Sequence, residues 1–246
     1  MPFNEERFKR QILLKEVGVE GQLRLNNARV IVIGAGGLGS PVLMYLAAAG
    51  IGHLGIVDGD VVSESNLNRQ ILYGDLDIGL LKAEQAKKRI SEINGDIDIT
   101  AFKIMLTWEN AAEIIRGYDC AVFCLDNIES RRIANKACVE LNMPYVEAGI
   151  DGFNGIMTTV VPGVTPCYEC LRANAKNIER AIPVLGAVAG IVGSMQALAV
   201  IRLILGVDEP SIGRLVITDG LYNNEMIEVK RNPQCAVCGR KDAQRV

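Results

Sequence analysis

Three glycines near the start of the chain have the spacing of a phosphate-binding turn. Gly34, Gly36 and Gly39 follow an apolar run at residues 30–33 and precede an apolar helical stretch at 41–49. In a nucleotide-binding βαβ unit such glycines allow a tight turn, close approach of a phosphate and close helix packing. The helix N-terminus then offers free N–H groups and a partial positive charge. The alternative is a turn that only packs a helix on a strand.

Polar side chains follow the second apolar run, residues 54–57. Asp58 ends this run about 20 residues after the glycines, where an acid bonds a ribose hydroxyl in nucleotide sites. Amide and guanidinium groups in the next stretch suit phosphate oxygens. We expect nucleotide contacts here, the alternative being a solvated polar loop; the candidates are Asp58, Asp60, Ser65, Asn66, Asn68 and Arg69.

Two further positions suit a nucleotide and its metal. Lys82 opens a predicted helix at 82–93, where its charge opposes the helix dipole unless it meets an anion. Asp126 and Asn127 follow a predicted strand at 119–125. A carboxylate at that edge of a parallel sheet is well placed to hold Mg²⁺ beside phosphates.

The chain contains two Cys-x-x-Cys pairs, one at Cys167 and Cys170 and the other at Cys235 and Cys238. Each pair supplies two thiolates, and together they complete a tetrahedral site of the structural zinc type. Unconnected thiols and a redox pair are the alternatives. The remaining cysteines lie in strand or helix patterns and are expected in the core.

The composition of the chain indicates which partners and which cellular location to expect. The chain has 246 residues, a net charge of −3 and seven cysteines. This charge gives no reason to expect nucleic acid or an anionic membrane as partner. An odd cysteine count without a leader pattern favours a reducing, cytoplasmic location. The apolar stretch 183–205 carries polar residues and glycines, which favours a buried helix over a membrane span, and His53 is expected to be structural.

The predicted elements give an α/β fold with a Rossmann-like sheet. The pattern favours a parallel nucleotide-binding half over 1–150 and an antiparallel, zinc-stapled half over 151–246, within one domain. Predicted helices cover 4–15, 18–26, 109–115 and 128–142; predicted strands cover 98–104, 144–149, 156–161, 214–218 and 226–230. The charged stretch 174–183 is expected to be a mobile loop.

Taken together, these motifs resemble the ThiF/MoeB/HesA family, relatives of the ubiquitin-activating enzymes. The likeness extends over nearly the whole chain, in the family's order: RFKRQ at 7–11, GAGGLG at 34–39, DGD at 58–60, SNLNRQ at 65–70, Lys82, Asp126-Asn127 and both Cys-x-x-Cys pairs. The resemblance implies an ATP- and Mg²⁺-dependent adenylyltransferase. Its substrate would be the C-terminal glycine of a small ubiquitin-like sulfur-carrier protein ending in Gly-Gly.

The resemblance also implies roles for individual residues. Gly37 would contact the nucleotide, Asp58 would hold the ribose, and Asn127 would lie beside the nucleotide. Arg69 and Lys82 would stabilise the phosphates with help from Asn66, and Asp126 would coordinate Mg²⁺. Because the family is dimeric, Arg10 would enter the ATP site of the other subunit of a homodimer. The four paired cysteines match the family's zinc ligands.

Many family members carry a cysteine in the loop before the segment PVLGAVAG, but residues 177–183 contain none, and Glu179 falls near that position. A covalent thiol step there is therefore not expected. The chain also has no rhodanese-like stretch after Cys238, so we expect a sulfurtransferase or cysteine desulfurase partner, or an external nucleophile. Two other functions stay open: an NAD-dependent oxidoreductase, and a non-catalytic dimeric scaffold that binds a ubiquitin-like protein.

Overall fold

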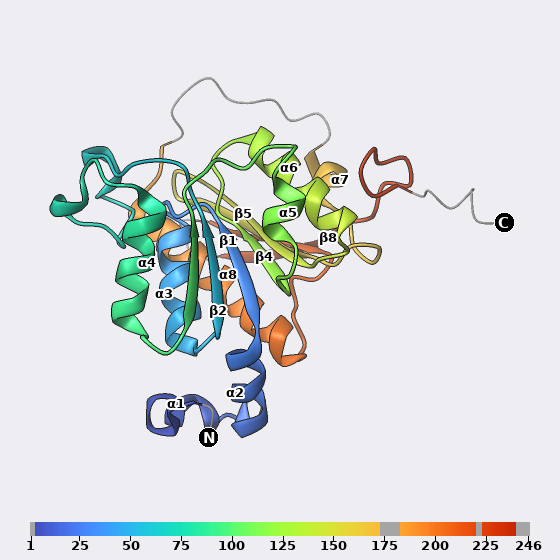
Figure 1. Ribbon diagram of the computed structural model, residues 1–246. Coiled ribbons are helices and arrows are strands. Elements are labelled where there is room, and N and C mark those ends of the chain that lie inside the picture. The colour runs from blue at the N-terminus through green and yellow to red at the C-terminus, as the bar shows by residue number, and fades with distance from the viewer. Residues whose placement is uncertain (1–2, 173–182, 220–222, 240–246) are drawn as a thin grey trace.

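One mixed sheet of eight strands organises the part of the chain that the computed structural model describes, residues 3–172, 183–219 and 223–239 (Figure 1). The strand order is β3-β2-β1-β4-β5-β6-β7-β8. The first five are parallel, and β6, β7 and β8 join antiparallel. The strands are β1 (Arg29–Ile33), β2 (His53–Val57), β3 (Asp98–Phe102), β4 (Cys120–Phe123), β5 (Tyr145–Asp151), β6 (Asn154–Val160), β7 (Arg214–Thr218) and β8 (Asn224–Glu228). The predicted fold class is confirmed.

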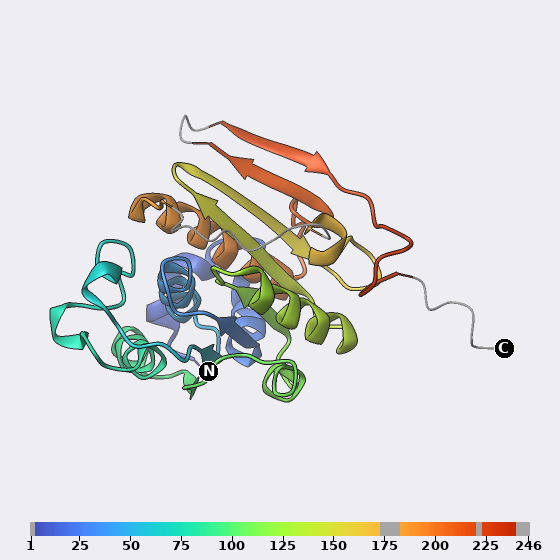
Figure 2. The ribbon, with the colours of Figure 1, turned by 90° about the horizontal axis from the view of Figure 1, so that it is seen from above.

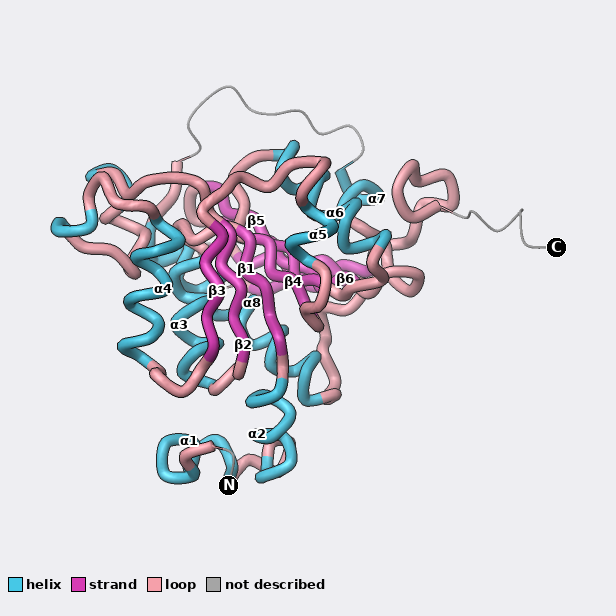
Figure 3. The backbone as a smooth tube through the Cα atoms, in the orientation of Figure 1, coloured by secondary structure: helices cyan, strands magenta, loops and turns pink. Residues whose placement is uncertain are grey.

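Helices cover both faces of the parallel strands (Figure 3). They are α1 (Glu5–Ile12), α2 (Gly18–Asn27), α3 (Gly39–Ala49), α4 (Lys82–Ile93), α5 (Ala111–Ile115), α6 (Ile128–Glu140), α7 (Tyr168–Arg172) and α8 (Gly186–Leu205). Short 3₁₀ turns, η1 (Glu64–Asn66) and η2 (Asp75–Asp77), lie in the segment between β2 and α4. Figure 2 shows β7 and β8 at the edge of the sheet, beyond β6.

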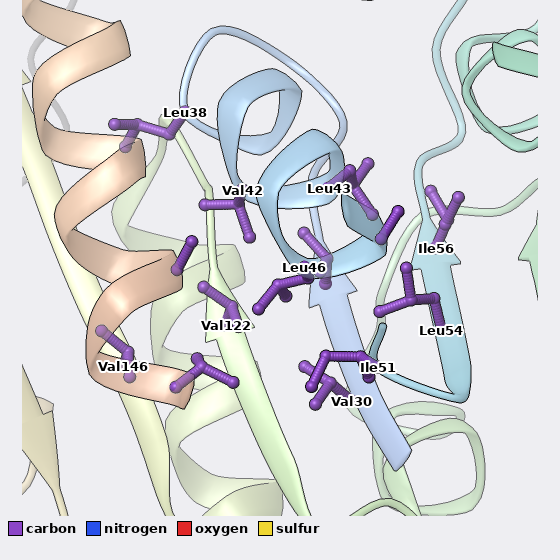
Figure 4. Close-up of a cluster of buried hydrophobic side chains, with 14 of the residues drawn as sticks. Val30, Leu38, Val42, Leu43, Leu46, Ile51, Leu54, Ile56, Val122 and Val146 are labelled. Carbon is purple, nitrogen blue, oxygen red and sulfur yellow. The ribbon is translucent and has the colours of Figure 1, made fainter. Parts of the chain in front are cut away.

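Alternate side chains along the strands belong to two separate hydrophobic cores, one on each face of the sheet. In β1, Val30 and Val32 belong to the cluster that α3, α4 and α8 cover, whereas Ile31 and Ile33 belong to the cluster under α5 and α6. Successive side chains of a strand point to opposite faces, so a strand that is apolar throughout must be covered on both. Figure 4 shows the first cluster between α3, α8 and the sheet.

The apolar stretch at 183–205 forms α8, a core helix. By length and composition α8 is long and apolar enough to cross a membrane, but half of its most apolar window is buried in the protein. Val188, Val192 and Val200 pack into the first core. Gly193 lets α8 approach α3, because a Cβ there would lie 2.7 Å from the Leu38 carbonyl oxygen.

The strand order reverses between β1 and β4, which leaves a crevice beyond their carboxyl ends. At this point Gly34 has φ +98°, and a Cβ on it would lie 2.3 Å from the Cys124 carbonyl oxygen. A Cβ on Gly39 would lie 2.1 Å from the Gly34 oxygen. These two contacts explain why the turn requires glycine.

Helix α1 lies at the opposite end of the molecule from the segment that carries η1 and η2 (Figure 1). Phe8 is buried, Gln11 donates to the Ala49 carbonyl oxygen (2.9 Å), and Arg7 donates to that of Ile93 (2.9 Å). Ala49 and Ile93 are the last residues of α3 and α4, the helices that begin at the crevice.

Several predicted boundaries differ from the observed ones. The first helix ends at Ile12, before the exposed Leu13 and Leu14, and not at residue 15. The third strand ends at Phe102, where its pairing with Val57 ends. The last strand begins at Asn224, which pairs with Thr218. Residues 173–182, which include nearly all of the expected mobile loop, lie outside the described part of the chain.

We expect Gly39→Ala to destabilise the protein by about 1–3 kcal/mol, because the new methyl group overlaps the Gly34 carbonyl oxygen. Gly190→Ala, in the interior of α8, is the matched control. A Cβ there meets no atom within 4 Å, so helix propensity predicts stabilisation of up to about 1 kcal/mol. Urea unfolding of both variants measures the difference, and equal effects would contradict the packing argument.

Candidate nucleotide-binding site and cysteine cluster

A cavity of about 970 Å³ opens at the carboxyl ends of the parallel strands. Its wall includes the ends of β1 and β2, the glycine turn, the start of α4 and the residues that follow β4. A second part of the wall comes from the β5–β6 hairpin and α7. The volume lies at the upper end of the range for small-molecule sites, about 300–1,000 Å³.

The glycine turn and Asp58 are joined directly. The Asp58 carboxylate accepts hydrogen bonds from the N–H groups of Ala35 (2.8 Å) and Asp60 (2.9 Å). Burial raises the pKa of Asp58 above its ordinary value, and these two N–H groups and Lys82 oppose that rise. Gly34, Gly36, Gly37 and Asp58 all line the cavity. Gly39 does not line it and instead begins α3.

Lys82 brings a positive charge to the wall. Its side chain is 8% exposed, and its ammonium donates to Asp60 at 3.1 Å. Arg69 lines the same wall and donates to the carbonyl oxygen of Ser65 (2.7 Å) and to Asn68 (3.0 Å). Both cations line the wall that the glycine turn before α3 completes, and cations beside a helix N-terminus suit a polyphosphate.

Asp126 and Asn127 follow β4 and line the same cavity as the glycine turn. Asp126 is exposed, and its carboxylate accepts from the Asn127 amide at 3.3 Å. The Asn127 oxygen accepts from the Ser130 N–H (2.8 Å) and thereby caps α6. The exposed Asp126 carboxylate fits a cation that retains water ligands, as Mg²⁺ does.

Besides Gly39, three predicted site residues lie outside the cavity wall of the single chain: Ser65, Asn66 and Arg10. The Asn66 side chain closes η1 by accepting from the Ser63 N–H (3.2 Å), and the Ser65 hydroxyl lies 3.1 Å from that of Ser63. Arg10 is exposed on α1, which packs at the far ends of α3 and α4. Helix α3 has 11 residues. At 1.5 Å per residue, its length separates Arg10 from the cavity by about 16 Å.

Other cavity residues were not predicted from the sequence. Gln70 is buried, and its side-chain oxygen has no hydrogen-bond partner in the described part of the chain. Arg131 and Glu147 form a buried ion pair, and Arg131 also donates to the carbonyl oxygen of Ala148 (2.7 Å). A charged residue inside the apolar strand β5 was the available signal for Glu147. Cys124, Tyr168 and Arg172 also line the wall.

The four paired cysteines meet where the start of α7 lies beside the segment that follows β8. The sulfur of Cys167 lies 4.0 Å from that of Cys170 and 3.7 Å from that of Cys235, and Cys170 lies 3.3 Å from Cys238. All four sulfur atoms lie within 4.8 Å of one another. Zinc–sulfur bonds of about 2.3 Å in a tetrahedron place sulfur atoms about 3.8 Å apart, so the cluster fits zinc.

Comparisons with known proteins agree with this geometry. The model of the ThiF family matches residues 8–237. Over 240 residues the chain is 42% identical to "Adenylyltransferase and sulfurtransferase MOCS3-1" of Drosophila pseudoobscura pseudoobscura, covering 94% of this chain and 53% of the relative. Over 252 residues it is 41% identical to the "Sulfur carrier protein adenylyltransferase" of Thermus thermophilus, covering 98% of this chain and 93% of the relative. The chain thus spans about half the length of its MOCS3 relatives.

Solved structures give the same result for the fold. The crystal structure of E. coli MccB with ATP superposes with a TM-score of 0.85 at 26% identity, covering 96% of this chain and 75% of MccB. MccB in complex with N-formylated MccA gives a TM-score of 0.85 at 25% identity, with coverages of 96% and 76%.

We expect Cys235→Ser to release about one zinc ion per chain and to lower the melting temperature, because a structural metal contributes folding free energy. Cys138→Ala is the matched control, since Cys138 is fully buried in the same core but outside the four-sulfur cluster. It should lower the melting temperature while the zinc content stays unchanged. Elemental analysis of the purified proteins decides, and a wild-type protein without metal would refute the zinc assignment.

Proposed function

Because the chain belongs to the ThiF family, we propose that it is an ATP-dependent adenylyltransferase acting on the C-terminal glycine of a ubiquitin-like sulfur-carrier protein. One observation carries the proposal: the glycine turn, Lys82, Arg69 and Asp126 line a single cavity at the point where the strand order reverses. The similar proteins reported above include a sulfur carrier protein adenylyltransferase and MccB in a crystal structure with ATP.

In the proposed reaction, a carboxylate oxygen of the substrate attacks the α-phosphorus of ATP. A bond forms between them, the bond from the α-phosphorus to the bridging oxygen breaks, and pyrophosphate leaves with that electron pair. The nucleophile is already ionised, so no general base is needed. His53, the chain's single histidine, lies at the start of β2 and contacts Asp98 (3.3 Å) instead.

The residues of the wall then act mainly by position and charge. The N–H groups of the glycine turn and the cations Arg69 and Lys82 face the charge that accumulates on the phosphate oxygens. Lys82 exchanges part of its contact with Asp60 for phosphate. Asp126 would hold Mg²⁺, which supplies charge neutralisation for the leaving pyrophosphate.

The second part of the wall would receive the substrate's C-terminal tail. Gly149, Asp151 and Asn154 line it from the β5–β6 hairpin, and Arg172 lines it from α7. A cavity of about 970 Å³ leaves room for a tail beside a nucleotide. The structural likeness to MccB bound to MccA, a complex that its title describes, favours such a two-part site.

The cofactors of this proposal are ATP and Mg²⁺ at the cavity and Zn²⁺ at the four cysteines. We propose that the partner is a sulfur-carrier protein for molybdopterin, thiamine or related biosynthesis, and that a sulfurtransferase or cysteine desulfurase supplies the sulfur in the cytoplasm. An NAD-dependent oxidoreductase is disfavoured by the buried Lys82 ammonium in the wall, which hydride transfer does not use.

ATP–pyrophosphate exchange with Mg²⁺, measured against a panel of ubiquitin-like proteins ending in Gly-Gly, tests the proposal. We expect exchange with one member of the panel. Arg69→Ala and Asp126→Ala should each reduce it by at least about 100-fold, as expected for groups that stabilise transition-state charge. Lys87→Ala, an exposed charge on α4 outside the cavity wall, should leave it unchanged. ATP binding without exchange would favour the scaffold function, and NAD binding without ATP binding would favour the oxidoreductase.

Arg10 gives a second test, because the single chain keeps it away from its own cavity. We propose that Arg10 completes the ATP site of the other subunit in a homodimer. Arg10→Ala and Lys82→Ala chains should each be inactive alone, and mixing them should restore part of the exchange rate through sites that carry both residues. Mixtures that stay inactive after verified subunit exchange would contradict a shared site.

A further inference from the structure

Tyr73 lies in the irregular segment between β2 and α4, yet it is 6% exposed. Its ring packs into the first core together with Val62 and Leu72. Its hydroxyl lies 2.8 Å from the carbonyl oxygen of Ala35 and 3.3 Å from that of Lys82. One hydroxyl hydrogen is thus shared between the glycine turn and the first residue of α4.

Both acceptors belong to segments that contribute residues to the cavity wall, the glycine turn and the start of α4. Ala35 lies inside the glycine turn, and its N–H donates to Asp58 at 2.8 Å. The Ala35 residue is therefore held from both sides, by Asp58 at its N–H and by Tyr73 at its carbonyl. Lys82 is similarly anchored at its backbone, where its N–H donates to the Asp60 carbonyl oxygen at 2.9 Å.

We propose that Tyr73 is a positioning residue, which fixes the Lys82 ammonium relative to the N–H groups of the glycine turn. Tyr73 itself does not line the cavity, so it acts through Ala35 and Lys82 and not by touching the nucleotide. The inference rests on the proposed function, because it assigns a purpose to the spacing of these two groups only if a polyphosphate binds between them.

The environment keeps the hydroxyl protonated. Burial raises the pKa of Tyr73 far above its ordinary value, and the charges of Asp58 and Asp77 raise it further. The neutral hydroxyl donates its hydrogen to the carbonyl oxygens of Ala35 and Lys82. Phenylalanine at this position keeps the ring in the core and removes only the donor.

ATP affinity, measured by calorimetry with Mg²⁺, tests the inference in a double-mutant cycle of Tyr73→Phe and Lys82→Ala. We expect Tyr73→Phe to weaken ATP binding about fivefold, the effect of one hydrogen bond of about 1 kcal/mol. In the Lys82→Ala protein the same change should weaken binding less than about twofold, since the group that Tyr73 positions is gone. A residue with a merely structural role would not show this coupling.

Tyr118→Phe is the matched control. Tyr118 is half-buried, hydrogen-bonded to Thr100, and packed against Gly55 away from the cavity wall. Removing the Tyr118 hydroxyl should lower the melting temperature without changing the affinity for ATP.

The outcomes separate the two claims. Unchanged affinity in Tyr73→Phe, or equal losses with and without Lys82, would overturn the role of Tyr73 while exchange by the wild type still supports the proposed function. A coupled loss of affinity in a protein that binds ATP but exchanges no pyrophosphate would support Tyr73 and overturn the adenylyltransferase. A wild type that binds no ATP would overturn both.

Discussion

The fold depends on one close approach of backbone at the point where the strand order reverses. Gly34 leaves β1 beside the Cys124 carbonyl, and Gly39 begins α3 against the Gly34 carbonyl, with no space for a Cβ at either position. The Gly34 N–H is paired with the Val57 oxygen (2.8 Å), and the Cys124 N–H with that of Ile33 (2.8 Å). The carboxyl ends of β1, β2 and β4 are thereby tied together, and the turn that follows β1 presents its backbone to the cavity.

The remaining architecture supports this junction. Because both faces of β1 and β4 are apolar, helices must cover both, and α8 provides the longest of these covers. The N-terminal end of α8 also supports the wall: a Cβ on Gly186 would lie 2.4 Å from the carbonyl oxygen of Asn68. The same helix therefore fills the core and holds the segment that carries Arg69.

The charged residues of the cavity are costly to bury, and the structure compensates most of that cost locally. The Lys82 ammonium is paired with the Asp60 carboxylate, and the Asp58 carboxylate accepts hydrogen bonds from two backbone N–H groups. Glu147 has Arg131 at one oxygen, while its other oxygen has no partner among the described residues. Buried polar groups left without a partner are uncommon in folded proteins, and Glu147 and Gln70 both line the cavity. Two of the four such atoms in the described part of the chain thus belong to cavity residues, which agrees with a site that binds a polar ligand.

The sequence by itself determined the local features. Glycine spacing, the apolar runs around it and the acid after the second run specify the βαβ unit, because each follows from the conformation of a few neighbouring residues. The ligand chemistry of two Cys-x-x-Cys pairs likewise predicted the cluster that the structure assembles from residues 68 positions apart.

Only the tertiary structure decided how distant segments meet. The pairing of Thr218 with Asn224, and not a propensity, set the start of β8. The packing of α1 on the ends of α3 and α4 placed Arg10 away from its own cavity. Tyr73 became a link between Ala35 and Lys82 because the segment after β2 folds back over the glycine turn. Contacts of this kind depend on the path of the whole chain, and no local pattern of residues encodes them.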